Sequence, residues 1–251
     1  MAPMEVDRAD GRTSNQLRPL SCTRNVLHRA HGSARWSQGD TIVLAAVFGP
    51  KAGTKKEENP EKASIEVIWK PKTGLIGKVE KEYEMILKRT LQSVCLLTIH
   101  PNTTTSVIVQ VVGDDDRPEL SLIQLEVQMI IKNNSSIIRA FLALRITHVM
   151  GLRTPQLLPC AINASCAALA DAGIPLKYLA VAICCGLTGS RSVILDPTKI
   201  EEKVFSYSCM LYLLVDYFNC LDRGYAACAK ISEFLRRSME SQAPSDLTKT
   251  T

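Results

Sequence analysis

Several patterns that mark common classes of protein are missing from this sequence. Among its nine cysteines no pair has the Cys-x-x-Cys spacing of a zinc site, and its four histidines show no metal-binding spacing. Cys160, Cys166, Cys184 and Cys185 lie instead within apolar runs, where a cysteine is typically a small core residue. We therefore predict no metal site and no cofactor.

Signals for export and membrane insertion are missing too. Residues 1–16 are charged and contain no apolar stretch of the kind found in a secretory signal. The apolar stretch Leu157–Leu187 is interrupted by Asp171 and Pro175, and Val204–Val215 is shorter than the roughly twenty residues that cross a bilayer. We expect an intracellular, soluble protein whose cysteines stay reduced.

Two common catalytic signatures are also missing or incomplete. No Gly-x-Ser-x-Gly nucleophile elbow occurs. The stretch Gly186–Arg191 lacks the Lys-Ser/Thr ending of a phosphate-binding loop and falls between two predicted strands, so we interpret it as a hairpin turn. Asp114, Asp115 and Asp116 could bind a hard cation, but an acidic turn after a strand is the commoner case.

What is present fits a globular protein. With 251 residues, 46% hydrophobic and 22% charged, the chain can bury a core. The formal net charge of +5 is modest and suits a protein that meets polyanions over part of its surface. Many of the cations lie between Lys51 and Arg89, where they could equally be a solvated surface.

Periodicity predicts an α+β architecture with a repeated strand–helix–strand order. Short β-rich runs come first, and Thr41–Phe48 is apolar enough to be a strand buried on both faces. Val79–Ile99 has the spacing of an amphipathic helix that could present Lys78, Lys81 and Arg89 together. Further elements are expected at Ser64–Pro71 (strand), Thr103–Val112 (strand), Ala161–Ala172 (helix), Tyr178–Leu187 (strand), Ser192–Leu195 (strand) and Asp222–Met239 (helix).

A series of short motifs resembles the RNase PH family. In order along the chain they are Arg8-Ala-Asp-Gly-Arg12, Leu17-Arg18-Pro19, Gly32-Ser33-Ala34, Gly39-Asp40-Thr41, Ala46–Pro50, Leu158–Ser165, Ala170–Pro175 and Leu195–Thr198. Several such motifs in order are far more specific than any one glycine pair. Within the family, the chain most resembles a small, non-catalytic ring subunit of the eukaryotic RNA exosome.

The resemblance implies an RNase PH-like fold and a ring of six such subunits around a pore for RNA. Active family members use phosphate to release nucleoside diphosphates from RNA, with cations that hold phosphate and a pair of carboxylates. Arg89 matches one phosphate-site arginine of active relatives, although it could also be a plain surface residue. Where those relatives have Gly-Thr-Arg-Thr, this chain has Gln156-Leu157-Leu158-Pro159. The positions of the acidic pair hold Glu202 and Ser208, so we expect no catalytic residues.

Two departures from the family pattern affect the domain assignment. Residues 117–156 have no counterpart in it and form an apolar insertion, which we expect to fold as two extra helices or to stay exposed. The insertion suggests an alternative or mis-assigned splice product. The chain after Glu202 is shortened, which predicts a missing part of the second sheet and an exposed edge. We therefore divide the chain into a tail at 1–16, a first half at 17–116, the insertion at 117–156, a second half at 157–240 and a tail at 241–251.

These observations lead to one functional hypothesis and two rivals. We expect an RNA-binding, non-catalytic ring subunit that pairs sheet edges with other RNase PH-like subunits, with Lys72, Lys78, Lys81 and Arg89 contacting the RNA backbone. The resemblance implies nuclear, nucleolar and cytoplasmic localisation and no membrane partner. The rivals are an active phosphorolytic exoribonuclease that uses Arg89 and Glu202, and a self-associating protein that has lost ring assembly.

Overall fold

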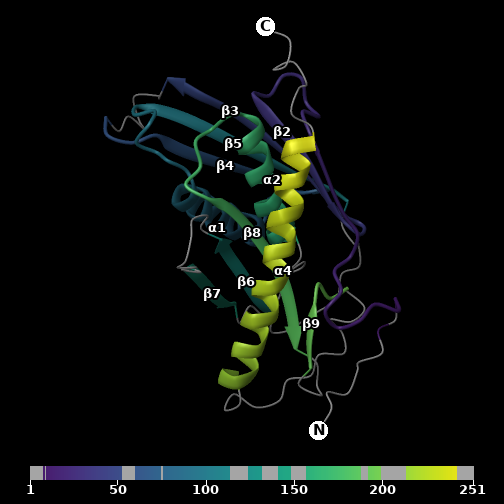
Figure 1. Ribbon diagram of the computed structural model, residues 1–251. Coiled ribbons are helices and arrows are strands. Elements are labelled where there is room, and N and C mark those ends of the chain that lie inside the picture. The colour runs from purple at the N-terminus through teal and green to yellow at the C-terminus, as the bar shows by residue number, and fades with distance from the viewer. Residues whose placement is uncertain are drawn as a thin grey trace, which may run out of the picture.

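Two β-sheets with helices between and beside them make up the fold of the computed structural model (Figure 1). The structure describes residues 8, 10–52, 60–74, 76–113, 124–131, 141–147, 157–187, 192–198 and 213–241. The combination of mixed sheets with separate helices confirms the predicted α+β class.

The first sheet has five strands in the order β1-β2-β3-β5-β4. Its strands are β1 (Leu20–Arg24), β2 (Gly32–Gln38), β3 (Thr41–Ala52), β4 (Ser64–Lys70) and β5 (Thr103–Gly113). All neighbours are antiparallel except β4, which runs parallel to β5. In β4 the alternating residues Ile65, Val67 and Trp69 are buried, as the sequence predicts for a strand with one face toward the core.

The second sheet has four strands in the order β7-β6-β8-β9. They are β6 (Gln124–Ile131), β7 (Phe141–Thr147), β8 (Leu179–Leu187) and β9 (Val193–Leu195), and all pairs are antiparallel. The expectation of two helices within residues 117–156 is wrong, because the described parts of that segment are the strands β6 and β7. β6 lies between β7 and β8, so this part of the segment is built into the sheet.

The edge of the second sheet at β9 is partly covered by the N-terminal segment. The backbone N–H of Leu195 donates to the carbonyl oxygen of Ser14 at 2.9 Å. Arg223 donates through Nη1 to the carbonyl oxygen of Val193 at 3.0 Å. The sequence predicts an exposed edge in this half, and at β9 two backbone groups of the strand instead have partners from other parts of the chain.

Three helices are described: α1 (Lys78–Val94), α2 (Leu157–Asp171) and α4 (Leu213–Ser241). α1 packs on β4, and α4 packs on β8, β6 and β9. α2 lies between the sheets, in contact with β2 and β3 on one side and β8 on the other (Figure 1). Every residue from Leu157 to Leu169 is buried, which explains why this helix is apolar all round.

α2 can approach the first sheet closely because Gly32 has no side chain. A Cβ atom at Gly32 would lie 2.2 Å from the backbone nitrogen of Ala172 and 2.5 Å from the carbonyl oxygen of Ala168. The carboxylate of Asp171 accepts hydrogen bonds from the backbone N–H groups of Ser33 (3.0 Å) and Asn25 (3.3 Å). Two motifs far apart in the sequence therefore meet where the first sheet contacts α2.

The cysteines that the structure describes support the sequence interpretation. Among the described residues no disulfide is formed, and Cys22, Cys95, Cys160, Cys166, Cys184, Cys185 and Cys228 are all buried. The four that the sequence places in the core are among them.

In the part of the chain that the structure describes, no helix is long and apolar enough to cross a membrane.

Candidate nucleic-acid interface

The four predicted RNA-binding cations lie on or just before α1, and all are exposed. Lys72 lies in the connection from β4, and Lys78 is the first residue of the helix. At 3.6 residues per turn, Lys78, Lys81 and Arg89 fall on one face, and they extend over about 16 Å along the helix axis. We call Lys78, Lys81 and Arg89 the α1 cation face.

Two carboxylates of α1 are held by backbone groups next to the helix. Glu80 accepts a hydrogen bond from the N–H of Gly77 at 2.8 Å, which caps the start of α1. Glu84 accepts one from the N–H of Trp69 in β4, also at 2.8 Å. Both carboxylates therefore have structural partners away from the lysines. Glu82, one turn after Lys78, lies on the same side of the helix, so the α1 cation face carries three cations beside one carboxylate.

The described residues at the start of α2 include no arginine or lysine. Leu157 and Leu158, at the positions where active relatives of the family carry Gly-Thr-Arg-Thr, are 7% and 0% exposed. They pack into the core and make no contact with solvent that a phosphate could use. Glu202 and Ser208, which match the acidic pair, lie outside the described residues.

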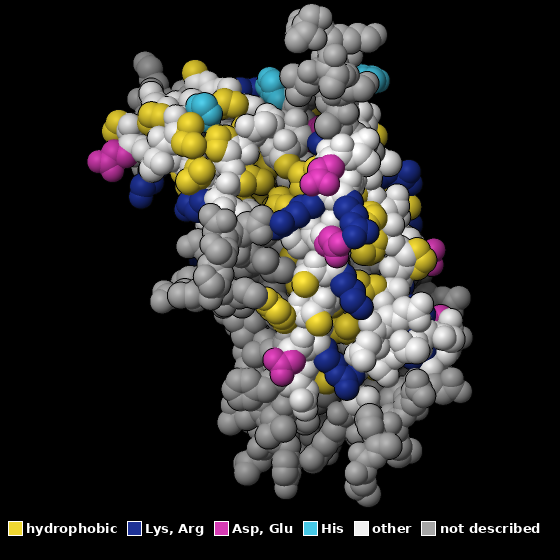
Figure 2. Space-filling view, in the orientation of Figure 1, with side chains coloured by type: hydrophobic (Ala, Val, Ile, Leu, Met, Phe, Trp, Pro, Cys, Tyr) yellow, Lys and Arg dark blue, Asp and Glu magenta, His cyan; other side chains and the backbone are white. Residues whose placement is uncertain are grey.

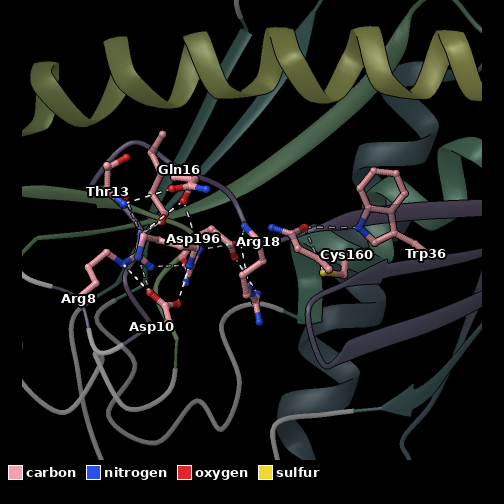
Figure 3. A network of polar contacts seen from close by, with 11 residues as sticks. Arg8, Asp10, Thr13, Gln16, Arg18, Trp36, Cys160 and Asp196 are labelled. Atoms are coloured by element: carbon pink, nitrogen blue, oxygen red, sulfur yellow. Dashed lines mark hydrogen bonds and ion pairs between the residues drawn. The ribbon is translucent and has the colours of Figure 1, made fainter.

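A buried network of arginines surrounds Asp196, directly after β9 (Figure 3). Arg18 donates its backbone N–H (2.9 Å) and Nε (3.0 Å) to Oδ2 of Asp196, and Nη2 (2.7 Å) to Oδ1. Arg8 donates to the carbonyl oxygens of Leu195 and Asp196, each at 3.1 Å. Asp196 is 1% exposed, so its charge is compensated by Arg18 in a low-dielectric site. This carboxylate is occupied structurally and is not offered to a substrate or metal.

Arg12 and Asp10 complete the network at the surface. Nε of Arg12 donates to Oδ2 of Asp10 at 2.6 Å, and its Nη atoms lie 3.3 Å from the carbonyl oxygen of Asp196. Burial acts to raise the pKa of Asp10, but the hydrogen bonds and charge of Arg12, with the charge of Arg8, outweigh it and lower that pKa below its usual value. The Arg8–Arg12 motif thus fastens the N-terminal segment to the end of β9.

Sequence reasoning found these residues as motifs but missed what they contact. Arg18 and Asp196 are 178 positions apart, and nothing local in either motif names the other as its partner. The only signal was that both motifs belong to one family pattern.

Among the described residues, no group of three or more His, Cys, Asp or Glu side chains could hold a metal ion.

Comparison with known proteins gives the same family. The model of the 3' exoribonuclease family, domain 1 (RNase PH), matches residues 16–175, a range that includes the 117–156 segment. An exosome complex exonuclease RRP46 homolog from Oryza sativa is 51% identical over 277 residues, covering 97% of this chain and all of that protein. An Arabidopsis thaliana protein of the same name is 50% identical and covers 96% of the chain and 98% of its own length.

Solved structures agree. The crystal structure of rice Rrp46 superposes with a TM-score of 0.70 at 55% identity, covering 91% of this chain and 98% of that one. A chain of the Archaeoglobus fulgidus exosome with RNA bound to the active site has a TM-score of 0.62 at 18% identity, which shows a common fold. With a family model over more than half of its residues and full-length relatives at half identity, this chain belongs to the RNase PH family.

Proposed function

We propose that this chain is an RNA-binding subunit of the exosome core ring, of the component 5 type, that supports 3'-to-5' RNA processing without cutting RNA itself. The match to exosome proteins named RRP46 along 97% and 96% of the chain carries this proposal. In this role the chain completes the ring with other RNase PH-like subunits and contacts the RNA that passes through it. We extend the proposal to rRNA maturation and to nuclear, nucleolar and cytoplasmic localisation, which imaging of the tagged chain would test.

The α1 cation face supports the RNA-binding part of this role. Its three cations have no fixed geometry for a base edge, and an array of exposed lysine and arginine side chains binds phosphates regardless of sequence. The buried leucines at the start of α2 support the non-catalytic part. Among the described residues there, no arginine stands where the family's chemistry uses a second phosphate-binding arginine.

Single substitutions on the α1 cation face test RNA binding. We expect Lys78→Ala, Lys81→Ala and Arg89→Ala each to weaken binding of oligouridylate and of a mixed-sequence RNA to the same degree. Each should also reduce the slope of log K against log salt by about 0.7, the value for one phosphate contact on a single strand. Lys230→Ala removes an exposed cation from α4 and serves as the matched control. If the three variants keep the salt dependence of the original chain, the assignment of this face is wrong.

A second candidate function is a phosphate-dependent 3'-to-5' exoribonuclease. The observation that favours it is the name of the two plant relatives, which calls them exonucleases. It predicts that the chain with RNA and inorganic phosphate releases nucleoside diphosphates, and that Arg89→Ala and Glu202→Ala abolish the release. We expect no release above the background of a heat-treated sample. Phosphate-dependent release that both variants remove would establish the enzyme instead.

A further inference from the structure

An open apolar hollow lies at one end of the five-stranded sheet, away from the α1 cation face and from the arginine network. It forms where the end of β3 and the start of β4 meet the α1–β5 connection and the α2–β8 connection. Most of its lining is aliphatic, with Pro50, Ile65, Leu96, Leu97, Ile174 and Pro175 as the main contributors. Figure 2 shows hydrophobic side chains gathered beside a histidine in this part of the molecule.

The walls of the hollow are fixed by backbone hydrogen bonds between the segments that form it. The N–H of Ala63 donates to the carbonyl oxygen of Leu97 at 2.8 Å, which ties the start of β4 to the α1–β5 connection. The N–H of Leu96 donates to the carbonyl oxygen of Pro175 at 2.9 Å, and that of Lys177 to Val94 at 2.7 Å. The hollow is therefore preformed, and a ligand would not have to order its walls.

Large apolar side chains at the mouth of the hollow face solvent. Leu96, which lines the hollow, is 36% exposed, and Ile99, which precedes the lining residue His100, is 50% exposed. Single exposed aliphatic residues are common on protein surfaces, but two beside a preformed apolar hollow make a continuous surface that a ligand can cover.

Cations surround this apolar surface. Lys51 follows the lining residue Pro50 and lies with Nζ 5.3 Å from the centre of the Phe48 ring, and Lys62 precedes the lining residue Ala63. The backbone N–H of Lys177 donates to the carbonyl oxygen of Val94. The charge of the Lys177 side chain acts to lower the pKa of the nearby Cys95 thiol, against the larger effect of burial. Among the described residues directly beside these three lysines in the sequence, Glu61 is the one carboxylate, so the described positions carry an excess of positive charge.

We propose that this hollow docks a short protein segment in which aliphatic anchor residues are flanked by aspartate or glutamate. The aliphatic lining fits the anchors, and Lys51, Lys62 and Lys177 complement the carboxylates. Nucleic acid fits less well, because bases stack on aromatic rings and the described residues that line the hollow include no phenylalanine, tyrosine or tryptophan. The proposal holds whether or not the α1 cation face binds RNA.

The test is a selection of random peptides displayed on phage against the full chain, followed by fluorescence anisotropy with the selected peptides. We expect the peptides to share aliphatic residues next to acidic ones. Ile99→Ser and Lys62→Glu should each weaken their binding about tenfold, a loss typical of one interface contact. Both positions are exposed, so the variants should fold as the original does, which circular dichroism checks.

Val112→Ser is the matched control, since Val112 is 45% exposed but lies about 30 Å away at the other end of β5. It should leave peptide binding unchanged. Four results would overturn the proposal. The peptides could lack acidic residues or bind the Ile99→Ser chain as well as the original; oligouridylate could displace them; or sedimentation could show that Ile99→Ser dissociates a dimer of this chain, which would make a second copy the occupant.

Discussion

Asp196 illustrates how a single buried charge fastens the N-terminal segment to the end of β9. Its carboxylate receives three hydrogen bonds from Arg18, while its own carbonyl oxygen receives others from Arg8 and Arg12. It adopts a left-handed backbone conformation with φ of 51°, which aspartate tolerates better than most residues. The left-handed backbone, the burial of the side chain and its pairing with Arg18 therefore all favour an aspartate at position 196.

Asp196→Asn should destabilise the protein severely. The substitution leaves Arg18 buried without its counter-charge, and breaking a buried ion pair in this way costs about 3–5 kcal/mol. Urea denaturation followed by circular dichroism measures the change in the free energy of unfolding. Asp222→Asn, on an exposed position of α4, is the control and should change it by less than about 0.5 kcal/mol. Equal stability of the two variants would mean that the network does not hold the fold.

The buried thiols of Cys95 and Cys166 predict a loss of stability at alkaline pH. Burial raises the pKa of each to about 12, from a usual value of 9.0. Because the folded state holds these protons more tightly, their contribution to stability is complete below pH 9 and is lost as the pH rises toward 12.

The free energy of unfolding measured against pH should therefore fall over this range. Cys166→Ala should make the fall shallower. In the native protein at pH 8, iodoacetamide should modify both thiols far more slowly than it modifies them in urea. Rapid alkylation of the native protein would show that these thiols are not buried.

At the scale of elements, α2 completes the hydrogen bonding of β8. β8 pairs with β6 along its length but with β9 only at Cys185–Leu187, so part of its other edge needs different partners. The side-chain amide of Asn163 supplies them, with Nδ2 donating to the carbonyl oxygen of Ala182 (3.0 Å) and Oδ1 accepting from its N–H (2.9 Å). Sγ of Cys166, also on α2, accepts a hydrogen bond from the N–H of Ala180 at 3.2 Å, so side chains of α2 take the place of a neighbouring strand here.

Asn163→Leu should leave both backbone groups of Ala182 buried and unpaired. Each unpaired buried group costs about 1–3 kcal/mol, so we expect a loss of at least about 2 kcal/mol in the free energy of unfolding. Hydrogen exchange should show faster exchange of the Ala182 amide than in the original chain. Asn219→Leu, on the exposed side of α4, is the control and should change neither quantity.

Periodicity predicted most elements of this fold from the sequence, with errors at their ends. The helix expected at Val79–Ile99 ends at Val94, because Cys95 is extended and pairs with Leu176. The final helix begins at Leu213 rather than Asp222. Gln124–Ile131 and Phe141–Thr147 were not recognised as strands. Short apolar runs do not distinguish a strand from a buried helix, and the pairing of β6 with β8 is distant in sequence.

At the candidate site, too, local patterns could be predicted from the sequence, whereas contacts between different elements could not. The helical spacing of Lys78, Lys81 and Arg89 could be predicted because it is local, and the structure places them on one exposed face. The sequence predicts less well that the carboxylates of Glu80 and Glu84 accept hydrogen bonds from backbone N–H groups. Glu84 binds Trp69 of a different element, and such a contact exists only once β4 and α1 have packed together.

At the scale of the whole molecule, several connections hold the two sheets together as one unit. α2 lies between them, Asp171 joins α2 to the β1–β2 region, and the arginines near the N-terminus bind the end of β9. On the outside, α4 carries both cations and carboxylates along its exposed side (Figure 2). A subunit that holds its own halves together in this way can present fixed sheet edges to its neighbours.

The central claim is that this chain works as a subunit of an exosome ring. The most direct test is an affinity purification of the tagged chain from its own cells, with mass spectrometry of the proteins that accompany it. The account predicts recovery of the other RNase PH-like ring subunits in amounts comparable to the tagged chain. Recovery of chaperones, or of the chain alone, would contradict it.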